Sequence, residues 1–229
     1  MKNLNIFSLV AEYENAKSGG VLNVPNVSFV DEDNSVRYLL KLDFTHNGYE
    51  YVDLGLPSRL KWATCNVGAS SPEQSGLYFA WGETQGYTGE QVKSGVRGFT
   101  EEEYNAGPAA SISADLTLEQ DAAHVNMGGN WRMPTKGEWL VLIHNCDAVW
   151  TKDYNGTGIQ GFIFTSHFNG KSVFFPATDT YNYEDYGCCY YWLASLRDYN
   201  SSYYFWGDDY PGIAFQERYL GLTVRAVCE

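Results

Sequence analysis

The side chains best suited to varied contacts are concentrated in the C-terminal fifth of the chain. Ten of the 18 tyrosines lie between Tyr181 and Tyr219, separated by short polar residues of the types Asn, Asp and Ser. Tyrosine offers a broad amphipathic contact at a small entropic cost, and the short polar side chains supply adaptable hydrogen bonds. The alternative is an aromatic sheet whose tyrosines pair across neighbouring strands. Because the run from Tyr181 to Trp192 is polar and rich in turn residues, we favour a binding surface.

Signatures of catalysis are much weaker. The chain has five cysteines and no C-x-x-C, although Cys188 and Cys189 are adjacent. His144 lies two residues before Cys146, but side chains with this spacing on a helix point to different faces. Motifs for dinucleotides, P-loops, zinc proteases, serine hydrolases and calcium loops are absent from the sequence. The four histidines are scattered without metal-ligand spacing: His46, His124, His144 and His167. We therefore expect no catalytic residue, no metal ion and no cofactor.

Composition excludes several classes of protein. The chain has 229 residues, and its 44% of hydrophobic residues is too high for a disordered polypeptide. Its net charge of −13 repels phosphate backbones, so we expect no nucleic-acid partner. No apolar run is long enough for a membrane helix, so we expect no membrane insertion. The first residues lack a basic head and an apolar core, which predicts synthesis in the cytoplasm without a secretory signal. The odd number of cysteines argues against a secreted disulfide framework.

One helix is signalled clearly, and it must help to position the C-terminal segment. Thr135 is suited to cap a helix over 136–146, and Glu138 three residues later completes a capping box. Trp139, Leu142, Ile143 and Cys146 recur with helical spacing and would form one apolar face. We expect a second helix near 117–124, whereas the polar stretch 82–115 permits no assignment. Strands are predicted at 49–54, 60–65, 77–81, 161–165, 172–176, 190–195, 202–206 and 222–227. Two main helices with many short strands predict an α+β domain over 49–229.

The N-terminal residues 1–48 differ in composition from the rest. The sequence 27–44 reads as a strand, a polar turn and a second strand, preceded by a glycine-containing connection. A lone hairpin is marginally stable in water. We therefore expect residues 1–48 to pack on the main domain or to serve in assembly or attachment, with another copy of the chain or a virion protein as partner.

Several motifs resemble those of known proteins. The runs YVDLGLPS (51–58), LKWATCNVGA (60–69) and YFAWGE (78–83) resemble a family found in gut bacteria and their phages. The run GGNWRMPTKGEW (128–139) is similar to the R-x-P-T-x-x-E-W signature of formylglycine-generating-enzyme-like domains, a branch of the C-type lectin fold. The ending, from Tyr191-Trp192 to Val227, resembles the variable region of proteins diversified by retroelements, a class that includes the phage major tropism determinant. Together these resemblances cover about residues 49–229.

The resemblance implies a C-type lectin-like fold whose last strands display variable side chains over about 181–220. The scaffold would be formed by Arg132, Pro134, Trp139, Trp192, Gly221 and Val224. The ligand, a protein or a glycan on a cell surface, would contact Tyr181, Tyr183, Tyr186, Tyr190, Asp198, Tyr199, Asn200, Tyr203, Phe205, Asp208, Tyr210 and Tyr219. A phage particle is one destination that the resemblance implies.

The residue types of this segment fit the diversification mechanism. Changes confined to the adenines of AAC and AAT codons give Tyr, Asp, Ser, Cys, Phe, Gly and Ala, which dominate the segment and include the adjacent Cys188 and Cys189. Two alternatives stay open. A lectin or adhesin of fixed specificity would use the same tyrosines to stack on sugar rings. An oxidase of the formylglycine-generating type would need Cys188 and Cys189 as a reactive pair.

Overall fold

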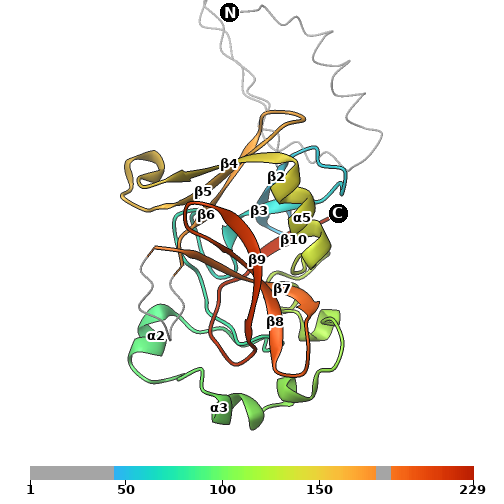
Figure 1. Cartoon of the computed structure of the whole chain (residues 1–229), viewed down its shortest axis with the longest axis vertical. Coiled ribbons are helices and arrows are strands. Elements are labelled where there is room, and N and C mark those ends of the chain that lie inside the picture. The colour runs from blue at the N-terminus through green and yellow to red at the C-terminus, as the bar shows by residue number, and fades with distance from the viewer. Residues whose placement is uncertain (1–43, 179–186) are drawn as a thin grey trace, which may run out of the picture. The chain divides into compact units, whose positions relative to one another are not determined.

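Three antiparallel sheets and several short helices make up the unit Thr45–Glu229 in the computed structural model, which describes residues 44–178 and 187–229 (Figure 1). This unit begins four residues before the expected boundary at Tyr49, because residues 45 and 46 already pair with the next strand. The predicted hairpin over 27–44 lies outside the described residues except for Phe44. The mixed composition of sheets and helices confirms the α+β class.

The first sheet joins the beginning and the end of this unit. Its strands are β1 (Thr45–His46), β2 (Tyr49–Asp53), β3 (Lys61–Asn66) and β10 (Arg225–Cys228), in the order β1-β2-β3-β10. Strand β10 runs antiparallel to β3, and its residue Val227 also exchanges two backbone hydrogen bonds with Arg132. The segment that precedes the helix α5 (Lys136–His144) is thereby tied to the last strand.

The other two sheets are antiparallel meanders of three strands. One contains β4 (Cys146–Thr151), β5 (Gly161–Ser166) and β6 (Ser172–Pro176). The other contains β7 (Cys189–Leu196), β8 (Ser201–Gly207) and β9 (Pro211–Glu217), with β8 in the centre. The third sheet and the two turns between its strands carry most of the described residues that were predicted to contact a ligand.

The helices are short and depend on their caps. They are α2 (Gly89–Lys93), α3 (Glu101–Asn105), α4 (Ala122–Met127) and α5 (Lys136–His144), with 3₁₀ turns η1 (Pro108–Ser111), η2 (Leu118–Gln120) and η3 (Tyr154–Gly156). Helices of this length are unstable alone in water. Threonine capping boxes satisfy the first backbone amides of α2, α3 and α5.

The R-x-P-T-x-x-E-W run has a direct physical explanation. Thr135 caps α5 and accepts a hydrogen bond from the Glu138 amide, as predicted. Glu138 also binds the Arg132 guanidinium through two hydrogen bonds of 2.6 and 2.8 Å. Burial opposes ionisation of Glu138, but the hydrogen bonds from Arg132 and Thr135 outweigh it and lower the pKa of this carboxyl. One residue later, Trp139 enters the core.

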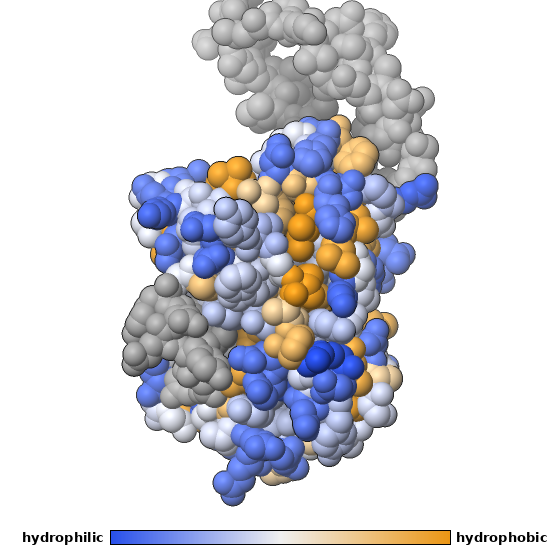
Figure 2. Space-filling view, viewed as in Figure 1, coloured by the Kyte–Doolittle hydropathy of each residue, from blue (hydrophilic) through white to orange (hydrophobic). Residues whose placement is uncertain are grey.

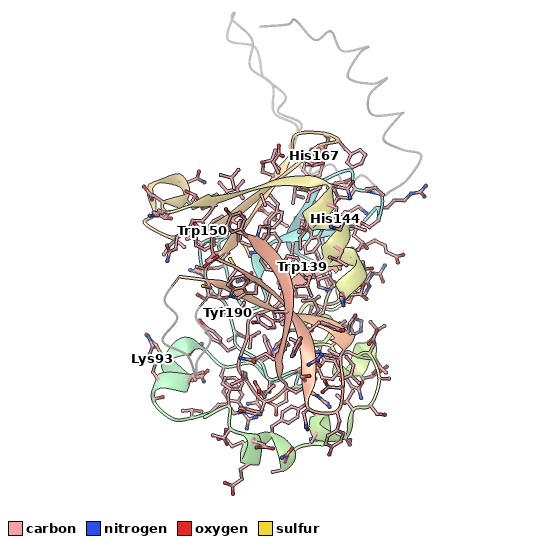
Figure 3. The ribbon with its side chains drawn as sticks, in the orientation of Figure 1. Lys93, Trp139, His144, Trp150, His167 and Tyr190 are labelled. Carbon is pink, nitrogen blue, oxygen red and sulfur yellow. The ribbon has the colours of Figure 1, made fainter. Side chains whose placement is uncertain are left out.

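Trp139 is the centre of the aromatic core. Its ring stacks on Phe205 of β8 with centroids 4.3 Å apart and lies 5.0 Å from the rings of both Trp62 and Phe175. These four side chains come from α5 and from all three sheets, and all are at most 1% exposed. Figure 3 labels Trp139 on α5, beside the strands of the third sheet. Aromatic packing at this point therefore fixes the third sheet against the rest of the domain.

Several predicted elements differ in the structure. The expected helix at 117–124 is divided into η2 and α4, because Asp121 caps α4 by accepting hydrogen bonds from the amides of Ala123 and His124. The expected strand at 77–81 makes only isolated bridges, among them Phe79 with Leu222. Of the last predicted strand, 222–227, only residues 225–227 form a strand, as part of β10. The sequence did not predict β1, β4, β9, or the short helices within 82–115.

Candidate ligand-binding surface

The structure distributes the twelve predicted contact residues among three environments. Tyr181, Tyr183 and Tyr186 lie outside the described residues. Of the other nine, one group lies at or beside the turn between β7 and β8 and includes Tyr219, a second lies at the turn between β8 and β9, and a third is packed within or against the sheet.

The turn between β7 and β8 brings Asp198, Tyr199 and Asn200 together. The Asp198 carboxylate accepts hydrogen bonds from the amides of Asn200 and Ser201, each 2.9 Å long, which tightens the turn. The hydrogen bonds from Ser201 and Asn200, aided by Arg197, lower the pKa of the Asp198 carboxyl. The Tyr199 side chain is 76% exposed at the tip. An aromatic ring is thus presented to solvent by a turn with an internal hydrogen-bond network.

A pocket of about 310 Å³ lies beside this turn, and we call it the Tyr199 pocket. Tyr199, Asn200 and Tyr219 form one side of it, and all three were predicted from the sequence. Residues of α3 and β9 complete the lining, chiefly Glu101, Asn105 and Glu217. Such a volume lies at the lower end of the range for small-ligand sites. The pocket combines aromatic surface with carboxylate and amide groups.

Arg218 holds the walls of the Tyr199 pocket in place. Its guanidinium is 1% exposed and donates hydrogen bonds to the carbonyls of Ala109, Ile112 and Tyr199 over 2.6 to 3.0 Å. The carbon at its centre lies 4.7 Å from the Trp81 ring centroid. Arg218 thereby connects the β7–β8 turn to the segment that follows α3. The sequence analysis did not single out this residue.

Tyr104 completes the support from α3. Its hydroxyl donates a hydrogen bond of 2.9 Å to the Trp81 carbonyl and a further bond to that of Ala109. Burial raises the pKa of the Tyr104 phenol to about 12, although the Arg218 cation partly opposes the shift. Tyr104 is therefore a neutral hydrogen-bond donor at physiological pH, and its role is structural.

The second predicted group lies at the other end of the strand β8. Asp208 and Tyr210 belong to the turn between β8 and β9, where Tyr210 is 79% exposed. The seven residues of β8 separate the two turns by roughly 20 Å, given a rise of about 3.3 Å per residue. A ligand must therefore be larger than a monosaccharide to contact both turns at once.

The third group corrects part of the prediction. Phe205 is fully buried and stacks on Trp139, so it belongs to the core and cannot contact a ligand in this structure. Tyr190 is also buried, and its ring stacks on that of Tyr204 with centroids 5.7 Å apart. Tyr203 is half-buried beneath Lys136, whose ammonium nitrogen lies 4.0 Å from the ring centroid. Tyr190 thus pairs across strands, as the alternative reading of the segment predicted, whereas Tyr203 contacts Lys136 of α5.

The surface near β9 includes side chains that the sequence analysis did not select. Phe215 on β9 is half exposed, and the Arg197 guanidinium lies over its ring at 3.2 Å. Figure 2 shows apolar side chains gathered over α5 and β9, surrounded by hydrophilic ones. Composition alone could have indicated Phe215, because it lies within the aromatic segment. The residues of α3 that line the Tyr199 pocket lie far from this segment in the sequence, and no local pattern indicated them.

The adjacent cysteines Cys188 and Cys189 differ in burial. Cys189 is fully buried, and its thiol contacts the carbonyls of Phe175 and Pro176 at 3.4 and 3.5 Å. Burial strongly raises the pKa of the Cys189 thiol, and it raises those of Cys146 and Cys228 to about 11. A thiol must ionise to act as a nucleophile. Cys188, which precedes β7, is half-buried.

The histidines have separate environments. His167 lies 3.0 Å from the Asp147 carboxylate on an exposed surface, and His124 contacts the Trp131 carbonyl at 3.1 Å. His144 at the end of α5 is exposed (Figure 3). Among residues 44–178 and 187–229, no three His, Cys, Asp or Glu side chains are grouped closely enough to hold a metal ion.

Comparisons with known proteins leave the fold and the site to be argued from the structure alone. No family model, no curated protein and no solved structure matches the chain. Within the part of the chain that the structure describes, no helix has the length and apolar character needed to cross a membrane.

Proposed function

We propose that residues 45–229 form a C-type lectin-like domain that binds a ligand without catalysis, and that a retroelement diversifies its C-terminal surface. The observation that carries the proposal is the Tyr199 pocket, in which three residues predicted as ligand contacts adjoin one cavity. Its exposed aromatic ring and short polar side chains have the composition of a recognition surface. The strands β7 to β9 and the turns between them carry most of this surface in the C-terminal part of the chain.

The chemistry of the site supports binding rather than turnover. The formylglycine-generating type of oxidase requires a reactive cysteine pair, whereas the Cys189 thiol is buried and has a raised pKa. The Tyr199 pocket is lined by two carboxylates, two amides and three tyrosines, and Arg218 is engaged by backbone carbonyls. These groups are suited to hydrogen bonding and stacking.

Diversification requires that substitution at the surface leave the core intact, and the structure supports this division. Tyr199 and Tyr210 lie on turns and are more than three-quarters exposed, so their replacement removes little packing. Trp192 and Val224, assigned to the scaffold, are fully buried. A Cβ atom at Gly221 would lie 2.5 Å from the Phe99 ring, so only glycine fits there.

The partner we propose is a protein or glycan on a cell surface. A ligand that spans the two turns of β8 would contact surface patches roughly 20 Å apart. Residues 1–48 would attach the domain to another copy of the chain or to a virion protein, and repeated display would raise avidity. Assembly into a phage particle after synthesis in the cytoplasm is part of the same proposal.

Deep sequencing of the 3′ end of the gene in a natural population tests the diversification. We expect substitutions at adenine positions in codons within about 181–220, concentrated at exposed positions such as Tyr199, Asn200 and Tyr210. Codons for the buried Trp192 and Phe205 should be invariant, or restricted to large apolar residues at Phe205. An invariant 3′ end would refute diversification, and equal variation at buried and exposed codons would refute the surface described here.

A lectin of fixed specificity is the second candidate, favoured by one observation. The Tyr199 pocket places an aromatic ring beside Glu101, Asn105 and Glu217, a combination that can stack on a sugar and accept its hydroxyl hydrogen bonds. A glycan array probed with the full chain and with Tyr199→Ser tests it. Binding to the same glycans by isolates that differ at 199 would exclude diversified recognition, whereas no glycan binding by any isolate would exclude the lectin.

A further inference from the structure

A second and larger cavity is lined in part by other residues of α3 and η1, which also contribute to the Tyr199 pocket. It has a volume of about 510 Å³ and shares no lining residue with the Tyr199 pocket. Three stretches of chain surround it: the turn 82–87, the segment 97–112 that includes α3 and η1, and the turn at Glu119 and Gln120. The size falls within the range of sites for small organic ligands.

We call this second cavity the Glu83 cavity. Its lining contains more negatively than positively charged side chains. Arg97 donates a hydrogen bond of 2.8 Å to Glu83 and lies 3.5 Å from Glu103. Glu119 is a third carboxylate in the lining, where Arg97 is the only cation. Three negative charges therefore face one positive charge, which favours a cationic ligand and opposes an anionic one.

Among the three carboxylates of the cavity, Glu83 is the one whose pKa is raised. Its side chain is 20% exposed, and that of Arg97 is 11% exposed. Burial raises the pKa of Glu83, and the nearby Glu103 raises it further, while Arg97 only partly opposes both effects. A donor cation in the cavity would stabilise the ionised form of Glu83 at little additional cost in desolvation.

The neutral part of the lining favours a hydroxylated ligand. Gln85 and Gln120 offer side-chain NH2 groups that can donate hydrogen bonds, while the Gln120 oxygen already accepts one from the Thr117 amide. Tyr87 is half-buried and presents an aromatic surface beside them. Carboxylates and amides bind hydroxyl groups, and an aromatic face packs against the apolar face of a sugar ring.

We propose that the Glu83 cavity binds a small hydroxylated ligand that carries an ammonium group, of which a 2-amino sugar is the simplest form. The ammonium group binds Glu83, and the hydroxyl groups bind the glutamine side chains. The proposal is independent of the function of the Tyr199 pocket, because the two cavities have separate linings.

The test is an NMR titration of the isotopically labelled full chain with glucosamine, followed through the backbone amides. We expect saturable shifts at Gly82–Gln85 and Gly107, with the amides of Tyr199 and Asn200 unchanged. N-acetylglucosamine has the same ring but no ammonium group, so it should bind at least about tenfold more weakly, as expected for the loss of a hydrogen bond between charged groups. Absence of saturable shifts at these amides, or equal binding of the two sugars, would overturn the proposal.

Two variants locate the interaction. Glu83→Gln keeps the size of the side chain and should weaken glucosamine binding about tenfold or more, whereas Glu90→Gln on α2 removes the same charge outside the cavity and should leave it unchanged. Gly107→Ala places a methyl group 3.9 Å from a Glu83 oxygen without backbone strain, because Gly107 has φ −101°. We expect this variant to fold and to bind more weakly. Wild-type affinity in both Glu83→Gln and Gly107→Ala would refute the assignment.

Discussion

Replacement of Arg218 by methionine is the sharpest test of how the Tyr199 pocket is built. The guanidinium donates hydrogen bonds to three buried or half-buried carbonyls, those of Ala109, Ile112 and Tyr199. Methionine fills much of the same volume but removes this donor from all three carbonyls, of which that of Ala109 still accepts hydrogen bonds from Tyr104 and from the Ile112 amide. Replacing both partners of a buried polar interaction by apolar residues often leaves stability unchanged, but Arg218→Met removes the donor and keeps the carbonyls.

The magnitude follows from these three bonds. Each acceptor that loses its donor costs about 1–3 kcal/mol, and because the three share one donor the losses are not fully additive. We expect Arg218→Met to lower the free energy of unfolding by about 3–5 kcal/mol. With an m-value of about 2 kcal/mol per molar urea, the midpoint of unfolding would fall by roughly 2 M.

The local effect separates a clamp from general destabilisation. Arg225→Met is the matched control, since Arg225 is also fully buried and donates to the carbonyls of Ala63 and Thr64, far in the sequence from the pocket. Hydrogen exchange should increase at 109–112 and 197–200 in Arg218→Met and stay near wild type there in Arg225→Met. A loss below about 1 kcal/mol, or unchanged exchange at 197–200, would refute the reasoning.

Three further predictions concern the core, the effect of pH and the thiols. Phe205→Ala should lower the free energy of urea unfolding by about 3–5 kcal/mol, while Tyr210→Ala should change it by at most about 0.5 kcal/mol; similar losses would contradict the assigned burial. The pKa of Glu138 in the folded protein lies below its ordinary value of 4.5. The stabilisation that its carboxylate provides is therefore complete above pH 4.5 and is lost as the pH falls through the folded pKa. Glu138→Gln should for this reason flatten the acid limb of a plot of stability against pH. An unchanged acid limb would exclude the role given to its pairing with Arg132. Iodoacetamide should modify Cys189 only after unfolding, as mass spectrometry would show, and modification in the native protein would contradict its burial.

The predictions from sequence succeeded where local signals were strong. The helix α5 begins at the expected cap because Thr135 and Glu138 satisfy its first amides within four residues of chain. Its end was predicted two residues too late, since Cys146 already belongs to β4. Helix spacing placed Cys146 on the apolar face, and no glycine or proline marks the change from helix to strand.

The missed elements lack a local signal. Strand β9 reads PGIAFQE and is half exposed on both faces, so it shows no alternation of apolar and polar residues. The short helices α2 and α3 lie in a polar stretch, and tertiary contacts such as that of Tyr104 with Trp81 hold α3 in place. Contacts between distant segments of the sequence leave no periodicity to read.

The residues of the Tyr199 pocket could be predicted only in part, because distant segments of the sequence form it together. The resemblance selected Tyr199, Asn200 and Tyr219 as ligand contacts within the tyrosine-rich segment, and these three residues line one pocket. It also indicated Phe205, because an aromatic strand residue can face either solvent or core and only the pairing register decides between them. Here Phe205 pairs with Tyr191 and Ile213, on the face of β8 that meets Trp139.

The pairing of β10 with β3 has a consequence for how the protein is made. Arg225 and Asn66 are partners across the first sheet although most of the domain separates them in sequence. On the ribosome the sheet cannot close until Cys228 has emerged, so folding must follow translation of nearly the whole domain. A frameshift or stop codon introduced before Arg225 therefore removes a buried strand. If the proposed diversification operates, copying errors of that kind would yield an unfolded chain for proteolysis instead of a folded protein with an altered surface.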